Sequence, residues 1–161
     1  MGAPTLDAPM ITIISMLTQD HARLLARLDR YTVGATGARA AERGHDDLAT
    51  LLREHLHFEE QNLYPLLMLH VDASTMGARA NAQHREIEAR FAAFAKAAED
   101  DAARPAAAAA LATVLRRHFA EEEALILPRL RRMMTDGMLR ELGARYRAVR
   151  TADVDGASLA R

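Results

Sequence analysis

The sequence predicts an all-α protein, an up-down-up-down four-helix bundle followed by a short C-terminal fifth helix. Alanine, leucine, arginine and glutamate dominate the composition, and all four favour helix. Apolar residues recur at helical spacing through four segments of about 20 residues, and alternating β-branched runs are missing. Four such helices, each about 30 Å long and joined by short turns, favour a bundle.

The first two helices are separated by a turn at residues 32–37, which contains two glycines. One apolar stripe predicts a helix over about 11–31, with His21 inside the stripe. A second stripe predicts a helix over about 38–63. Proline lacks a backbone N–H and clashes with the preceding turn, so Pro65 is expected to kink or end this helix.

The third and fourth helices are predicted from their N-terminal signals. Asp72 and Ser74 are both good N-cap residues, and a helix from there is expected to run to about residue 98. Pro105 suits the first turn of the fourth helix, and Pro128 is expected to kink or end it. Thr135 or the aspartate after it is expected to cap a shorter fifth helix.

The composition also limits what the chain can be. Residues 1–150 are predicted to form one bundle domain, and residues 151–161 a disordered tail with little to pack against. The sequence has no cysteine, so disulfides and thiolate metal sites are excluded. The net charge of −1, with both signs mixed, predicts no nucleic-acid partner. The apolar run at 10–17 is too short for a membrane span and lacks a signal-peptide layout, so we expect a cytoplasmic protein with no membrane partner.

The second half of the chain repeats the first at an offset of 63 residues. Residues 48–55 recur as residues 111–118 with few changes. The repeat keeps potential metal ligands and prolines in step, pairing His21 with His84, Glu59 with Glu122 and Pro65 with Pro128. This pattern predicts one chemical site assembled from two matching halves.

Helical geometry places these side chains on the inner faces of the predicted helices. A histidine and a glutamate four residues apart lie on the same face, about 40° apart. Each helix then contributes one imidazole, and two helices add a carboxylate. Six such donors are too many for one tetrahedral zinc and suit two metals with open positions for water, a bridging oxide, O2, NO or peroxide. The predicted metal ligands are His21, His55, Glu59, His84, His118 and Glu122.

Several residues near the predicted metal ligands are candidates for supporting roles. Glu60 and Glu123 follow the repeat but are rotated away from the site face, so solvated or ligand-supporting roles are favoured over ligation. Asp20 and Gln83, each just before a predicted ligand, are expected to orient an imidazole. Tyr64 is expected to be a packing residue, with a redox or hydrogen-bonding role near the metals as the alternative.

The remaining candidates have weaker support. His45, His57 and His70 are predicted to lie on the surface. Glu88 stands four residues after a predicted ligand but has no counterpart in the first half, and Glu121 is a possible substitute for the glutamate that follows it. A bundle in which the four histidines are ordinary hydrogen-bonded core residues is the structural alternative, but it leaves two buried carboxylates at matching places without a cation.

The motif set resembles the hemerythrin-like, or HHE cation-binding, domain over about residues 11–130. His21, His-Leu-His-Phe-Glu at 55–59, His84, and His-Phe-Ala-Glu-Glu at 118–122 carry the resemblance. The resemblance implies two non-haem Fe ions joined by an oxo or hydroxo bridge, with the four histidines as terminal ligands and the two glutamates as bridges. The ligand types alone also permit zinc or manganese.

The resemblance implies a small diatomic molecule or peroxide as the partner. Oxygen-carrying hemerythrins have a fifth histidine on the third helix and an aspartate on the fourth, whereas this chain has Ala80, Glu88 and Glu122 at the relevant positions. We therefore expect binding or reduction of O2, peroxide or NO in oxidative or nitrosative stress or redox sensing. An iron- or oxygen-responsive binding module without turnover is the alternative, and enzymatic activity stays open.

Overall fold

The structure, a computed structural model, describes residues 11–32, 38–70, 73–97 and 100–158, and these contain helices but no strand. The all-α prediction is therefore confirmed for this part of the chain. The side chains of 38–45 and of residues from 151 onward are outside the description. The five long helices are α1 (Ile13–Thr32), α2 (Ala38–Phe58), α4 (Ser74–Ala97), α5 (Arg104–Glu121) and α7 (Asp136–Ser158).

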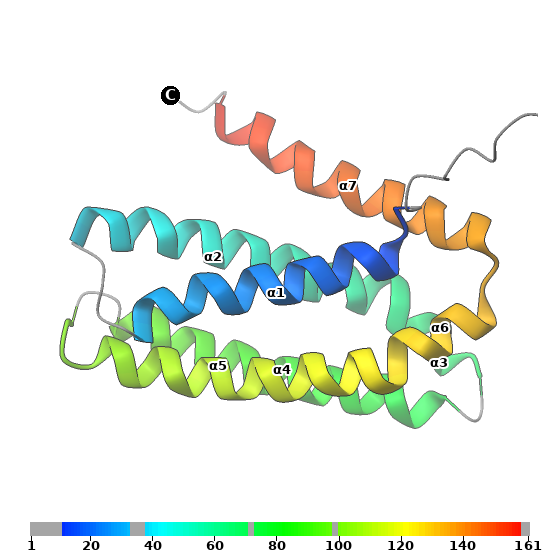
Figure 1. Ribbon diagram of the computed structural model, residues 1–161, viewed down its shortest axis with the longest axis horizontal. Helices are drawn as coiled ribbons and strands as arrows, with labels where there is room; N and C mark the ends of the chain where they lie inside the picture. Colours follow the sequence, from blue (N-terminus) through cyan, green and yellow to red (C-terminus); the bar gives the residue numbers. More distant parts are fainter. Residues whose placement is uncertain (1–10, 33–37, 71–72, 98–99, 159–161) are drawn as a thin grey trace, which may run out of the picture.

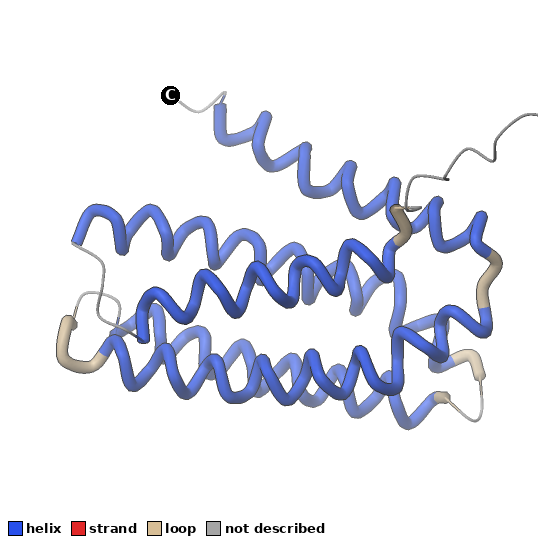
Figure 2. The backbone as a smooth tube through the Cα atoms, viewed as in Figure 1, coloured by secondary structure: helices blue, strands red, loops and turns tan. Residues whose placement is uncertain are grey.

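Four of these helices form a bundle, as expected. In Figure 1, α1, α2, α4 and α5 extend along the long axis, and consecutive helices run in opposite directions. The helix α1 packs against both α2 and α5, and α5 packs against α4. The helix α7 packs mainly on α1 and diverges from the bundle toward its C-terminal end (Figures 1 and 2).

Two short π-helical turns interrupt α2 and α5 at matching places. The first, η1 (Glu59–Leu63), leads into α3 (Tyr64–Met68), and the second, η2 (Glu122–Ile126), leads into α6 (Leu127–Met133). In each turn the N–H just before the proline bonds to the glutamate carbonyl five residues back.

The α-helices before the two prolines end as expected, but each ends at a widened turn after which a helix resumes. Pro65 and Pro128 each lie in the first turn of a continuing helix, and the turn before each widens by one residue. A wider turn accommodates the missing proline N–H, and π turns of this kind are frequent at functional sites.

The fifth helix is longer than the short one expected. Thr135 caps it, because Thr135 Oγ1 accepts a hydrogen bond from the N–H of Met138 at 3.3 Å. The backbone remains helical to Ser158, past the start of the tail predicted to be disordered, and residues 159–161 lie outside the described residues. The domain boundary at residue 150 stays a prediction.

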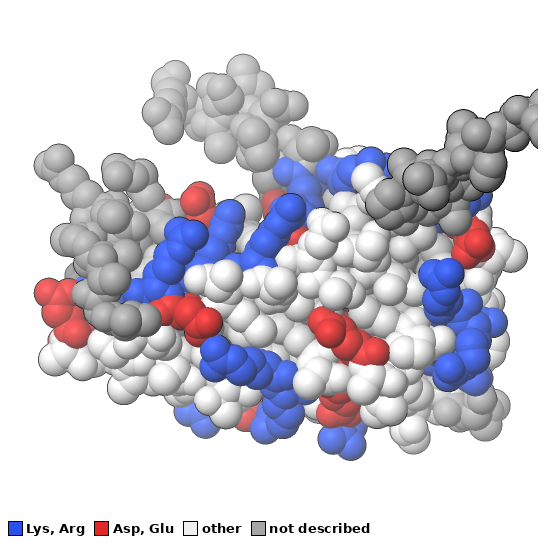
Figure 3. Space-filling view, viewed as in Figure 1, with Lys and Arg blue, Asp and Glu red and all other residues white. Residues whose placement is uncertain are grey.

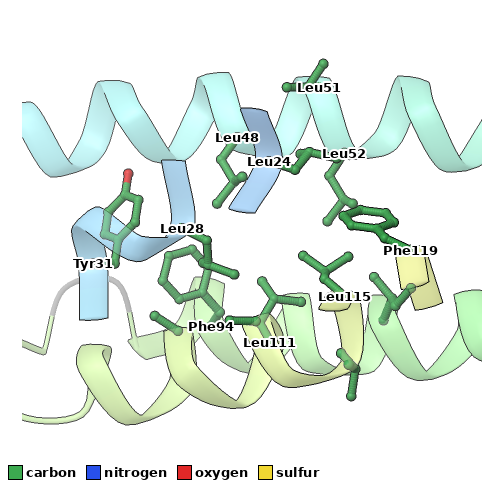
Figure 4. Close-up of a cluster of buried hydrophobic side chains, with 14 of the residues drawn as sticks. Leu24, Leu28, Tyr31, Leu48, Leu51, Leu52, Phe94, Leu111, Leu115 and Phe119 are labelled. Atoms are coloured by element: carbon green, nitrogen blue, oxygen red, sulfur yellow. The ribbon is translucent and has the colours of Figure 1, made fainter. Parts of the chain in front are cut away.

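The apolar core has two parts, with the predicted ligands between them. One cluster, drawn in Figure 4, includes Leu24, Leu52, Ile87 and Leu115. The other cluster includes Leu17, Phe58, Ala80 and Ile126. Along α1, α2, α4 and the segment formed by α5 and η2, the predicted histidine stands between a residue of one cluster and a residue of the other. The site is therefore a polar layer sealed from water by apolar side chains at both ends.

The surface carries charges of both signs. Figure 3 shows lysine and arginine side chains interspersed with aspartate and glutamate on the face in view. Among the described residues, no helix combines the length and apolar character that a membrane span requires.

Candidate metal centre

All six predicted ligands converge in the layer between the two apolar clusters. Each helix of the bundle supplies one imidazole, and each π turn opens with one of the two glutamates. None is more than 2% exposed. They are His21 on α1, His55 on α2, Glu59 on η1, His84 on α4, His118 on α5 and Glu122 on η2.

The donor atoms form two overlapping groups, and within each group they lie within 4.8 Å of one another. The two groups share Glu59, whose oxygens face different histidines. Its Oε1 lies 3.0 Å from His55 Nε2, and its Oε2 lies 3.3 Å from His84 Nε2. The first group is His21, His55, Glu59 and Glu122, and the second is Glu59, His84 and His118.

Four buried polar atoms at the centre have no hydrogen-bond partner among the residues that the structure describes. They are His21 Nε2, His55 Nε2, Glu59 Oε1 and Glu122 Oε2. The His21 nitrogen lies 3.2 Å from the Glu122 oxygen, and the His55 nitrogen lies 3.0 Å from the Glu59 oxygen. Both are ion-pair distances, but neither pair has the geometry of a hydrogen bond. Buried polar atoms left in this way are costly, and a cation among them would satisfy all four. Imidazole nitrogens and carboxylate oxygens suit iron, manganese or zinc.

The outer nitrogens of two imidazoles contact carboxylates supplied by the π turns. His84 Nδ1 lies 2.8 Å from Glu60 Oε1, and His21 Nδ1 lies 2.7 Å from Glu123 Oε1. A ring that donates its Nδ1–H to a carboxylate leaves Nε2 free as a more basic metal ligand. These contacts favour the ligand-supporting role expected for Glu60 and Glu123 over the solvated one.

The outer nitrogens of the other two imidazoles meet different partners. His118 Nδ1 lies 2.9 Å from Gln83 Oε1, as the position of Gln83 before a ligand suggested. His55 Nδ1 lies 3.5 Å from the hydroxyl of Tyr146, which donates to Asp20 Oδ2 at 2.8 Å. Asp20 thus acts on His55 through Tyr146. No repeat or motif marked Tyr146, because α7 has no counterpart in the other half.

Tyr64 packs in the core as expected, and its hydroxyl also reaches the site, so the hydrogen-bonding alternative applies as well. It is fully buried, and its hydroxyl oxygen lies 2.9 Å from His84 Nε2. The same hydroxyl is within 3.2 Å of Glu59 Oε2 and 3.4 Å of Glu122 Oε1. Burial and the neighbouring carboxylates raise the pKa of Tyr64 well above its usual value, so the hydroxyl keeps its proton.

Mutual contacts shift the pKa values of the buried ligands. Burial would lower the pKa of His21 and of His84, but contacts with carboxylates outweigh burial and raise both. Burial would raise the pKa of Glu59, but the imidazoles around it, chiefly His55, hold that pKa well below its usual value. In the metal-free protein, His21 and His84 therefore form buried ion pairs with the carboxylates beside them.

The weaker candidates lie away from the centre. His57, His70 and Glu88 are exposed, as expected for the two histidines. Glu121 does not replace its neighbour, because its carboxylate contacts Arg79 and Gln83. The side chain of His45 lies outside the described part of the chain.

A hollow between α2 and α4 approaches the site from outside. Its volume is about 230 Å³, and its walls include Leu56, Phe91, Arg53 and Glu60. The Glu60 side chain, 33% exposed, borders this hollow and also contacts His84. Glu60 therefore connects the solvent side of the bundle with one buried imidazole.

A helical bundle with a buried set of histidines and glutamates defines a class of cation-binding proteins. Comparison with known families matches residues 12–130 to the hemerythrin HHE cation-binding domain. The match covers well over half of the chain, and the chain belongs to this family. No match was found among curated proteins or among solved structures.

Proposed function

We propose that the chain binds two non-haem irons through the six residues predicted from its sequence. The observation that carries the proposal is the pair of overlapping donor groups that share Glu59. A carboxylate whose two oxygens face different imidazoles suits a bridge between two cations. His21 and His55 would be terminal ligands of one iron, and His84 and His118 of the other.

Glu122 would be the second bridge. Its Oε2 lies 3.2 Å from His21 Nε2 and 3.9 Å from His118 Nε2, so it faces both halves. Four imidazoles and two shared carboxylates leave open positions on two six-coordinate metals. Zinc of the structural type has closed tetrahedral coordination, which this number of donors exceeds.

The open positions support binding or reduction of a small oxidant such as O2, peroxide or NO. When bound, the irons would supply the redox chemistry. The protein would contribute the Tyr64 hydroxyl, which holds a proton within 3.4 Å of both glutamates and can donate a hydrogen bond to a small molecule there. The apolar clusters on both sides would exclude bulk water.

A metal-responsive module without turnover is the second candidate. The four unpartnered atoms at the centre favour it, because removing the cation would leave them buried without compensation. Metal binding would then contribute directly to folding stability, and a partner could detect the change in stability.

Iron content and oxidant consumption would test both candidates. Wild-type protein loaded with iron should contain close to two irons per chain and show an absorption band that bleaches on reduction. His118→Ala should lose metal. His57→Ala, a matched change at an exposed histidine on α2, should not. Protein without iron, or His118→Ala with full iron, would contradict the site. Rapid loss of peroxide or NO on addition to the reduced protein favours the first candidate, and a large melting-temperature rise without consumption favours the second.

A further inference from the structure

The helix α7 reaches the metal site although it lies outside the residues that match the family. Its Tyr146 is fully buried, and the ring packs on Phe58 with centroids 4.7 Å apart. The hydroxyl donates to Asp20 Oδ2 at 2.8 Å and lies 3.5 Å from His55 Nδ1. One hydroxyl therefore connects α7 to an imidazole on α2 and a carboxylate on α1.

The direction of this chain of contacts follows from the donors available. If His55 binds a metal through Nε2, its proton resides on Nδ1, which can then only donate. The oxygen of Tyr146 is the acceptor, and the Tyr146 proton is given to Asp20. An ionised carboxylate accepts only, so the order from His55 through Tyr146 to Asp20 has a single direction.

Arginine side chains hold the carboxylate at the end of the chain. Arg150, also on α7, places its Nη1 2.9 Å from each oxygen of Asp20. Arg23 Nη1 lies 3.3 Å from one of these oxygens. Asp20 is fully buried, so these contacts offset the cost of its burial as an anion. The helix α7 thus supplies both the hydroxyl that donates to Asp20 and a guanidinium that pairs with its carboxylate.

The other half of the site performs the same task differently. There Gln83, which occupies the position equivalent to Asp20, contacts His118 directly at 2.9 Å. A neutral amide orients a ring, whereas a chain that ends on a carboxylate also increases the basicity of the ring.

We propose that Tyr146 and Asp20 are positioning residues, so that α7 contributes to the metal centre; this proposal rests on the proposed iron site. They hold the His55 ring with Nε2 toward the metal and make the iron at His55 the more electron-rich of the two. The contact from His55 to Tyr146 is the longest of the four imidazole contacts. Its effect on iron affinity should therefore lie at the lower end of the range for groups that support a ligand.

The test compares Tyr146→Phe with a control on the same helix. Tyr146→Phe keeps the ring and removes only the hydroxyl. Leu142→Ala, one turn earlier and also buried, loosens the packing of α7 without removing a polar group. Ferrous iron affinity is measured anaerobically by competition with a chelator, and the reduction potential of the loaded protein is measured beside it. We expect Tyr146→Phe to bind one iron about tenfold more weakly and to shift the potential upward. Leu142→Ala should lower the melting temperature and leave both quantities unchanged.

Asp20→Asn gives an independent check, because it removes the negative charge while keeping an acceptor. It should raise the potential as Tyr146→Phe does, and the double variant should show less than the sum of the two effects. Wild-type affinity and potential in Tyr146→Phe would overturn the inference, as would equal losses in Leu142→Ala. A wild-type chain that binds no iron would overturn the proposed function as well, so the two failures are distinguishable.

Discussion

The two halves of the bundle place their imidazoles almost identically. The His21 and His55 rings have centroids 5.0 Å apart at 79°, and the His84 and His118 rings have centroids 4.8 Å apart at 78°. The contacts of Glu60 with His84 and of Glu123 with His21 are also equivalent by the 63-residue offset. The repeat in the sequence is thus a local two-fold relation between the halves of the site.

The halves differ in the groups around the imidazoles. Tyr64 and its equivalent in the second half, Leu127, belong to the same apolar cluster, but only Tyr64 brings a hydroxyl into the site. Phe119 stacks on His21 at 4.0 Å and 10°, and Leu56 stands at the equivalent position in the first half. The proposed metal ligands follow the repeat. The groups that would contact a small molecule, or change the basicity of one imidazole, do not follow it.

The largest effect is expected from the residue that both donor groups share. Glu59→Gln removes the charge of the proposed bridge, and both irons should be lost or bound more weakly by more than about 100-fold, the upper end for groups that only support a ligand. Glu122→Gln should act mainly on the iron at His21. Anaerobic iron titration of both variants measures the difference, and full retention of two irons in Glu59→Gln would exclude it as a bridge.

Matched changes in the two halves test the symmetry itself. Glu60→Gln and Glu123→Gln each remove a carboxylate from the Nδ1 of one histidine, and each should weaken iron binding by about tenfold. The two variants should agree within a few-fold in a chelator competition assay. A loss confined to one of them would show that the halves are not equivalent at this level.

A smaller effect is expected where the halves differ. Tyr64→Phe keeps the buried ring but removes the hydroxyl near both glutamates, so iron content should stay at the wild-type value. The rate of reaction with the oxidant should fall by about tenfold or more, because a positioned proton donor is lost. Stopped-flow measurement at matched iron content checks this, with Tyr31→Phe, in the apolar cluster away from the site, as the control. An unchanged rate would return Tyr64 to a packing role.

The smallest effect is a pH dependence that both halves should share. In the metal-free protein the raised pKa values of His21 and His84 give stability that is present below the ordinary value of 6.5 and lost as the pH rises through the raised values. Iron must displace these protons, so its binding weakens as the pH falls. The melting-temperature gain on adding iron should shrink between about pH 8 and about pH 6. A gain that grows over this range would contradict the sign.

The sequence predicted the fold and the six converging residues because both depend on periodicity. Helical spacing places a stripe inward, and the repeat identifies which polar members of the stripe recur. The π turns were not predicted, since a proline pattern alone does not distinguish a widened turn from a helix end. Tyr64 was expected mainly to pack and Tyr146 was not singled out, because each reaches the site from one half only, and Tyr146 does so across 91 residues of sequence. Contacts of that kind depend on how α7 packs, which periodicity does not specify.

The central claim is that two matching halves hold two irons around shared carboxylates. Anaerobic titration of the metal-free wild-type chain with ferrous iron, followed by absorption and by metal analysis after desalting, tests it most directly. The proposed site predicts saturation close to two equivalents per chain. Saturation at one equivalent, or no retained iron, would contradict it.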